Sequence, residues 1–177
     1  MTGDTSATVE LWVRSFAPTT TGPKHERAIE RLDRLEGHPS VDSVSVRVWG
    51  RTFERTERTR RVPHLEGIAQ RLERFEEWAE RTGRSLEPFF RTHHVESKIT
   101  GDAADVCRLP TLALAEYRED ELVHLAPSSE GERTVTVTER LEALLGGEGQ
   151  PDPGSILEFD GNTDEESNER RRLEHSR

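Results

Sequence analysis

The stretch from Arg108 to Ala126 constrains the fold of this chain most strongly. A dense apolar run begins after Pro110, a polar segment follows at Arg118 to Glu121, and a second apolar run closes the stretch. Two apolar runs of strand length separated by a polar turn are typical of a buried β-hairpin. We therefore expect a hairpin here, with the upstream elements packed against it.

Two strands, each followed by a helix, are predicted before the hairpin. Residues 8–16 and 41–49 alternate apolar and polar side chains, as strands with one better-buried face do. The first helix is expected to begin at Pro23 and stop at Gly37, and the second is expected to begin at Pro63 and end at Gly83. Proline suits the first helical position, and glycine suits the position just past a helix end.

The remaining segments have weaker patterns. Within residues 84–105, Leu86, Pro88, Phe89 and Phe90 indicate an anchored turn or short helix, and the segment from His93 to Asp102 then leads into the hairpin. Adjacent His93 and His94 point in different directions on any regular element, so no metal site is expected there. After the hairpin, Thr136 to Glu139 fits a capping box, which predicts a short terminal helix. The expected order is β, α, β, α, a β-hairpin and α.

The composition points to a salt-rich solvent. Of the 25 basic residues only Lys24 and Lys98 are lysines, and they face 35 acidic residues, which gives a net charge of −10. Dense carboxylates with weakly hydrated arginine are typical of an acidic surface adapted to a salt-loaded cytoplasm, as in haloarchaea. We expect a cytoplasmic protein, because no signal peptide or membrane-length apolar run stands in the sequence.

One domain is expected, at residues 8–146, between a flexible N-terminus at 1–7 and a disordered charged tail at 147–177. Cys107 is the only cysteine, which excludes an internal disulfide and any cysteine-rich metal site. Whether its thiol is reactive is left open, although a lone cysteine is usually a small buried apolar residue. No spacing of Ser, His and carboxylates indicates a catalytic site, so no catalytic residue, metal or cofactor is predicted and a non-enzymatic role is favoured.

A basic segment stands out in this acidic chain. Residues 50–61 hold five arginines and two glutamates, a local charge of +3. Such a run is usually solvated surface, but arginines that converge on one face would form a nucleic-acid-binding patch. The candidate contacts are Arg51, Arg55, Arg58, Arg60 and Arg61.

The element order and the sequence Leu109-Pro110-Thr111 resemble the thioredoxin-like fold. The family places a proline, commonly in the cis form, at the start of its third strand. The resemblance implies an α/β fold, thioredoxin-like βαβ-α-ββα, with a mixed sheet. It also implies that the family's cysteine pair would stand where this chain has Thr19, Thr20 and Thr21, so dithiol chemistry is absent.

Two functions remain open at this point. The resemblance implies a redox-inactive module that binds an unknown protein or peptide in a groove formed by Thr19, Thr20, Thr21, Leu109 and Pro110. The alternative is a nucleic-acid-associated regulator, which would use the basic segment or a helix-turn-helix between Ile68 and Phe90. The oligomeric state is not determined, although Trp12 and Trp49 on an exposed sheet face would favour association.

Overall fold

The computed structural model describes residues 6–16 and 22–146, which form a mixed α/β structure. Residues 1–5 of the predicted flexible N-terminus at 1–7 and the predicted tail from 147 lie outside this range, whereas Ala7 is buried and begins β1, so it is not part of a loose end. In chain order the elements are β1 (Ala7–Val13), α1 (Pro23–Leu35), β2 (Val41–Val48), β3 (Thr52–Arg55), the 3-10 helix η1 (Thr59–Arg61), α2 (Pro63–Thr82), β4 (Arg91–Glu96), β5 (Ala103–Arg108), β6 (Leu112–Arg118), β7 (Glu121–Ala126), β8 (Ser128–Glu130), β9 (Arg133–Val135) and α3 (Val137–Leu144).

The predicted hairpin is confirmed and belongs to a four-stranded sheet. Strands β6 and β7 pair antiparallel across Glu119 and Asp120, which both have positive φ, as two-residue hairpin turns require. The sheet order is β2-β1-β6-β7, with β1 parallel to β2 and antiparallel to β6. The mixed sheet is therefore confirmed, and β1 and β6 occupy its centre.

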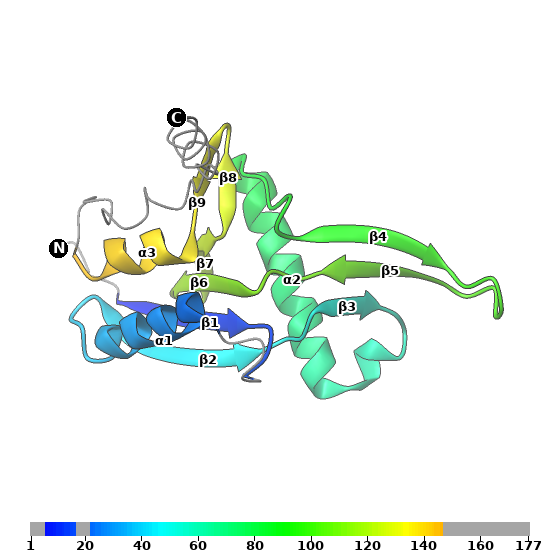
Figure 1. Cartoon of the computed structure of the whole chain (residues 1–177), viewed down its shortest axis with the longest axis horizontal. Helices are drawn as coiled ribbons and strands as arrows, with labels where there is room; N and C mark the ends of the chain where they lie inside the picture. The colour runs from blue at the N-terminus through cyan, green and yellow to red at the C-terminus, as the bar shows by residue number, and fades with distance from the viewer. Residues whose placement is uncertain (1–5, 17–21, 147–177) are drawn as a thin grey trace, which may run out of the picture.

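Helices cover both faces of this sheet (Figure 1). Val9, Leu11 and Val13 of β1 pack in one core cluster with residues of α1 and α3. Trp12 packs in a second cluster with α2, on the opposite face. The expected strand with one better-buried face is therefore wrong for β1, because α2 crosses the face that the polar positions occupy.

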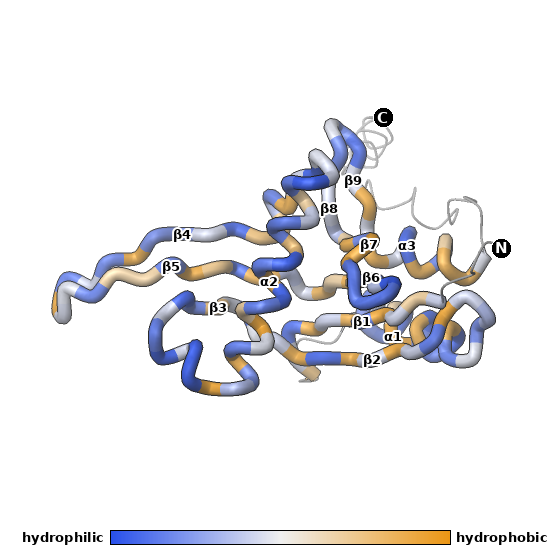
Figure 2. The backbone as a smooth tube through the Cα atoms, turned by 180° about the vertical axis from the view of Figure 1, so that it is seen from behind, coloured by the Kyte–Doolittle hydropathy of each residue, from blue (hydrophilic) through white to orange (hydrophobic). Residues whose placement is uncertain are grey.

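A second sheet has the order β3-β5-β4 and was not predicted (Figure 1). The anchored turn expected at Leu86 to Phe90 is present, because the amides of Phe89 and Phe90 donate to the Leu86 carbonyl at 3.0 and 2.9 Å. Strands β4 and β5 follow it, where no strand was predicted, and they project away from the four-stranded sheet as a long ribbon. Every residue of β4 is exposed. The strand pairs through its backbone without a buried face, so its sequence lacks the apolar alternation that marks a half-buried strand. Figure 2 shows hydrophilic and hydrophobic residues mixed along both strands of the ribbon.

The two tryptophans are buried, contrary to the expectation of an exposed sheet face. Trp12 and Trp49 are 3% and 4% exposed, and their rings stack with centroids 5.2 Å apart. Phe75 and Phe90 approach Trp49 edge-on, which joins the ribbon's base to α2 and to the main sheet. These rings stabilise the junction and offer no association surface.

Local signals set the helix ends as predicted. Gly83, with φ of 67°, follows α2, and the capping box of Thr136 and Glu139 opens α3. None of the helices in the described part of the chain is long and apolar enough to cross a membrane.

Candidate nucleic-acid interface

The basic segment forms β3, a turn and η1 directly before α2. Reciprocal hydrogen bonds hold the turn: the Thr56 amide donates to Thr59 Oγ1 at 3.1 Å, and the Thr59 amide donates to Thr56 Oγ1 at 3.2 Å. The hydroxyl of Thr59 also donates to the Thr56 carbonyl at 2.6 Å. These hydrogen bonds hold the backbone conformation of the turn in which Arg58 lies and from which Arg60 and Arg61 follow.

The five candidate arginines differ in their charge partners. Arg55 forms an ion pair with Glu76 of α2 at 2.5 Å, so its charge is already matched. Arg58, Arg60 and Arg61 are exposed and have no ion-pair partner among residues 6–16 and 22–146. Arg51 is likewise exposed and unpaired within the described residues, but it precedes β3, and its charge acts on Arg14. Three of the five arginines therefore follow β3 with unmatched charges, Arg55 is paired, and Arg51 lies at the other end of β3.

The N-terminal turn of α2 continues this surface. Val62 occupies the N-cap position and provides no side-chain cap, so the first amides of a 20-residue helix lack that partner. Such amides and the helix dipole favour an anion. Pro63 and His64 are exposed, whereas Ile68 and Leu72 further along the helix are buried in the core. The core thus anchors the helix and leaves its first turn accessible.

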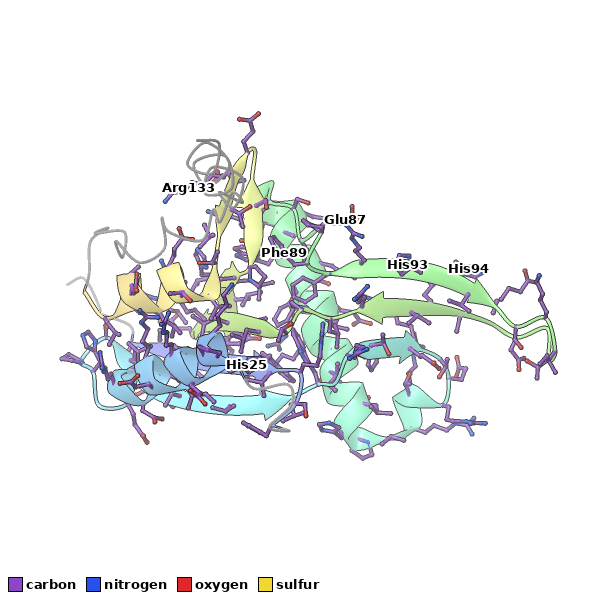
Figure 3. All side chains as sticks on the ribbon, in the orientation of Figure 1. His25, Glu87, Phe89, His93, His94 and Arg133 are labelled. Carbon is purple, nitrogen blue, oxygen red and sulfur yellow. The ribbon has the colours of Figure 1, made fainter. Side chains whose placement is uncertain are left out.

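The ribbon adds a narrow, accessible element in the same sheet as β3. Val95 is 50% exposed, and Ile99 near its tip is 96% exposed. His93 and His94 lie along β4 in Figure 3, and His94 Nδ1 is 2.9 Å from Asp105 Oδ1 of β5. Within the described residues no group of three or more potential metal ligands gathers.

The predicted peptide groove is not available at Leu109 and Pro110. The Leu109 amide donates to the Arg51 carbonyl at 2.9 Å, and the Leu109 carbonyl accepts from Arg14 Nη2 at 2.7 Å. The Pro110 carbonyl accepts from Trp49 Nε1 at 3.3 Å. An extended peptide needs free backbone groups, and here both groups of Leu109 are already used.

The expected cis bond before Pro110 is also wrong. Within the described residues the cis peptide bonds are Glu87-Pro88 and Ala126-Pro127, so Leu109-Pro110 is trans. The remaining predicted groove residues, Thr19, Thr20 and Thr21, lie outside the described residues.

Cys107 is a buried core residue, 2% exposed, as lone cysteines usually are. Burial raises the pKa of its thiol above the ordinary value. The thiol is therefore protonated at neutral pH and is a poor nucleophile.

Sequence reasoning missed a second group of arginines. Arg14, Arg91 and Arg108 line one pocket, together with Leu109 and Pro110. They come from three segments far apart in the chain, and no local charge run reveals them. The only sequence signal was the position of Arg108, next to the Leu109-Pro110 pair.

Comparison with known proteins identifies the family. A family model described as a helix-turn-helix domain matches residues 1–149. The chain belongs to this helix-turn-helix domain family. No curated protein and no solved structure matches it significantly. The resemblance to the thioredoxin-like family is therefore wrong, and so is the redox-inactive peptide-binding module that it implied.

The helix-turn-helix predicted between Ile68 and Phe90 does not have two helices. One helix, α2, runs from Pro63 to Thr82, and the chain then turns through Gly83 into β4. In the part of the chain that the structure describes, the helices closest in sequence are η1 and α2, which only Val62 separates.

Proposed function

We propose that this protein is a nucleic-acid-binding regulator that contacts duplex phosphates through Arg58, Arg60 and Arg61. One observation carries the proposal: in a member of a helix-turn-helix family, three exposed arginines without carboxylate partners in the described chain directly precede a long helix. Arginine side chains and helix N-termini are the groups that proteins place on nucleic-acid phosphates.

The local arrangement supports a role for η1 and α2 as the consecutive helices of the family. In helix-turn-helix proteins, residues near the N-terminus of the second helix contact base edges. Here the exposed first turn of α2 bears Pro63 and His64, and the core holds the rest of the helix in place. The arginines of η1 would fix the register on the backbone, because phosphate contacts position a protein without reading sequence.

The ribbon supports contact with a groove. A major groove admits a two-stranded β-ribbon as well as a helix. Strand β5 pairs with both β3 and β4, so one sheet connects the ribbon to the basic segment. Exposed Val95 and Ile99 give the ribbon apolar side chains, which can contact thymine methyl groups.

The net charge of −10 means that the protein should bind a polyanion only where salt screens the repulsion between them. Overall repulsion between the protein and a polyanion is screened at high salt, where charges further apart than a few ångströms no longer interact strongly. Direct arginine-phosphate contacts then act locally. A salt-adapted protein can therefore combine an acidic surface with a small basic interface.

The test is a fluorescence-anisotropy titration of a labelled mixed-sequence DNA duplex at the lowest KCl concentration that keeps the protein folded. The variant Arg58→Gln/Arg60→Gln/Arg61→Gln should bind about tenfold more weakly or worse, because it removes three arginines that pair with phosphates. Circular dichroism should show an unchanged fold, since all three side chains are exposed.

The matched control is Arg27→Gln/Arg118→Gln/Arg133→Gln. These arginines are also exposed and have no ion-pair partner within residues 6–16 and 22–146, and they lie on α1, β6 and β9. The control changes the net charge equally, so it should bind as the wild type does. Equal weakening of both variants would mean that binding depends on total charge, and the proposed interface would be wrong.

A further inference from the structure

A pocket of about 360 Å³ lies where β5 ends and β6 begins, against the turn that precedes β4. Figure 3 labels Phe89, which forms part of its apolar wall. Its lining residues are Arg14, Pro88, Phe89, Arg91, Arg108, Leu109, Pro110 and Thr111. Three of these are arginines, and none of them is acidic.

The arginines are held close together by the sheet. Arg108 of β5 lies directly opposite Arg91 of β4 in the antiparallel register. Like charges at directly opposite positions destabilise a strand pair. Burial and the nearby charges of Arg51 and Arg108 lower the pKa of Arg14. The fold therefore brings positive charges together at an electrostatic cost.

The hydrogen bonds of Arg14 are incomplete. Its Nη2 donates to the Leu109 carbonyl at 2.7 Å, which fixes the guanidinium at the pocket. Its Nε is buried and has no hydrogen-bond partner. A buried donor without a partner destabilises the protein unless a ligand or water satisfies it.

Three other arginines with largely buried side chains are paired with carboxylates. Arg31 pairs with Glu142 at 2.6 Å, Arg71 with Glu10 at 2.9 Å, and Arg84 with Glu130 at 3.2 Å. Arg14, Arg91 and Arg108 have no such partner in the described chain. The chain has 35 acidic residues, but none of them lines this pocket, so its three arginines can bind the anion of a ligand.

We propose that this pocket binds the phosphate monoester group of a small molecule. A terminal phosphate carries about −1.5 to −2 charges at neutral pH, which offsets three guanidinium groups better than a carboxylate or a phosphodiester does. Guanidinium forks match the geometry of phosphate oxygens. Phe89, Pro88 and Leu109 supply an apolar wall for the rest of the ligand. The inference goes beyond the proposed function, because it does not require duplex binding.

The first measurement is thermal unfolding of the full chain in inorganic phosphate and in KCl at equal ionic strength. At a phosphate concentration ten times the dissociation constant, Tm should rise on the order of 4 °C. Isothermal titration with inorganic phosphate gives the constant itself. No difference between phosphate and chloride at equal ionic strength would overturn the proposal.

The second measurement uses pocket variants. Arg91→Gln and Arg108→Gln should each weaken phosphate binding by about tenfold or more, because each removes charge-assisted hydrogen bonds. Arg118→Gln, at an exposed position outside the pocket, should leave it unchanged. Equal phosphate affinity in all three variants would exclude the pocket.

The third measurement separates a binding role from a structural one. Without phosphate, Arg91→Gln and Arg108→Gln should melt at the wild-type temperature or above it, because the variants relieve like-charge repulsion. A lower Tm without phosphate, together with a full phosphate-dependent shift, would make these arginines structural and overturn the proposal.

Competition with the DNA duplex tests whether the pocket binds a small-molecule phosphate or a phosphate of the DNA backbone. Inorganic phosphate at saturating concentration should not displace the duplex beyond the effect of ionic strength, and Arg108→Gln should bind the duplex as the wild type does. If phosphate competes and Arg108→Gln loses duplex affinity, the pocket holds a backbone phosphate, and the assignment to a small molecule is wrong.

Discussion

Arg71 of α2 forms a two-point contact with Glu10 of the central strand β1. Arg71 Nε is 3.1 Å from Glu10 Oε2, and Arg71 Nη2 is 2.9 Å from Oε1. Trp12 Nε1 also donates to Glu10 Oε2 at 3.2 Å. Because Glu10 is only 3% exposed, this contact joins α2 to the sheet inside the protein.

Removing one partner of this pair should destabilise the fold. Glu10→Gln or Arg71→Met should each lower the free energy of unfolding by about 3 kcal/mol, because each removes the closer ion pair of a buried carboxylate, whose other charged partner, Arg47, is 3.4 Å away and half exposed. Glu30→Gln is the control, since it breaks an exposed pair with Arg34, and it should cost no more than about 1 kcal/mol. If urea denaturation gives the same loss in free energy of unfolding for all three variants, the Glu10 pair does not hold α2 to the sheet.

This pair also shows what the sequence could predict. The alternation of Val9, Leu11 and Val13 correctly predicted β1 and its apolar face. It could not reveal that α2 covers the other face. The alternation of a strand shows which residues share a face of the sheet, but it does not show which element packs on that face. Glu10 is buried through a partner 61 residues away, and no local pattern contains that information.

The partly buried His124 should make stability depend on pH. Burial, followed by the charge of Arg140, lowers the pKa of His124 to about 4, despite the opposing effect of Glu116. The unfolded chain, with an ordinary histidine pKa of about 6.5, then binds a proton that the folded chain does not. The free energy of unfolding should therefore fall as the pH drops from about 6.5 to 4.

Urea denaturation across this pH range tests the effect. His124→Gln should reduce the fall in stability between pH values of about 6.5 and 4, because its side chain does not titrate. His93→Gln, at an exposed position of β4, should leave the pH dependence as it is in the wild type. An unchanged pH dependence in His124→Gln would assign the effect to other groups.

Cys107 should be unreactive in the folded protein. Its side chain is buried, and burial raises the pKa of the thiol. Alkylation by iodoacetamide should therefore be slow in native conditions and fast in denaturant. Rapid alkylation of the folded chain would contradict this. Cys107→Ala should retain duplex binding, since the residue lies in the core.

Salt should stabilise the protein. Its 35 acidic residues repel one another when they are unscreened, so Tm should rise between low and molar KCl. Sodium sulfate alone is an unsuitable comparison, because it also strengthens apolar burial. A Tm that is independent of KCl would contradict the inferred adaptation to salt.

The candidate interface was only partly predictable from the sequence. The charge run identified Arg58, Arg60 and Arg61 because they are neighbours in the chain. It could not separate them from Arg55, whose partner Glu76 lies 21 residues away on α2. The ribbon was missed because β4 has no buried face, and the pocket arginines were missed because tertiary structure alone brings them together.

The salt dependence of duplex binding tests the central claim most directly. The logarithm of the wild-type binding constant should fall linearly with the logarithm of the KCl concentration. In Arg58→Gln/Arg60→Gln/Arg61→Gln the magnitude of this slope should decrease by about 0.9 for each arginine-phosphate pair that the variant removes, or about 2.7 for three. The control variant at Arg27, Arg118 and Arg133 should keep the wild-type slope. A triple variant with an unchanged slope would contradict the proposal that these arginines bind nucleic-acid phosphates.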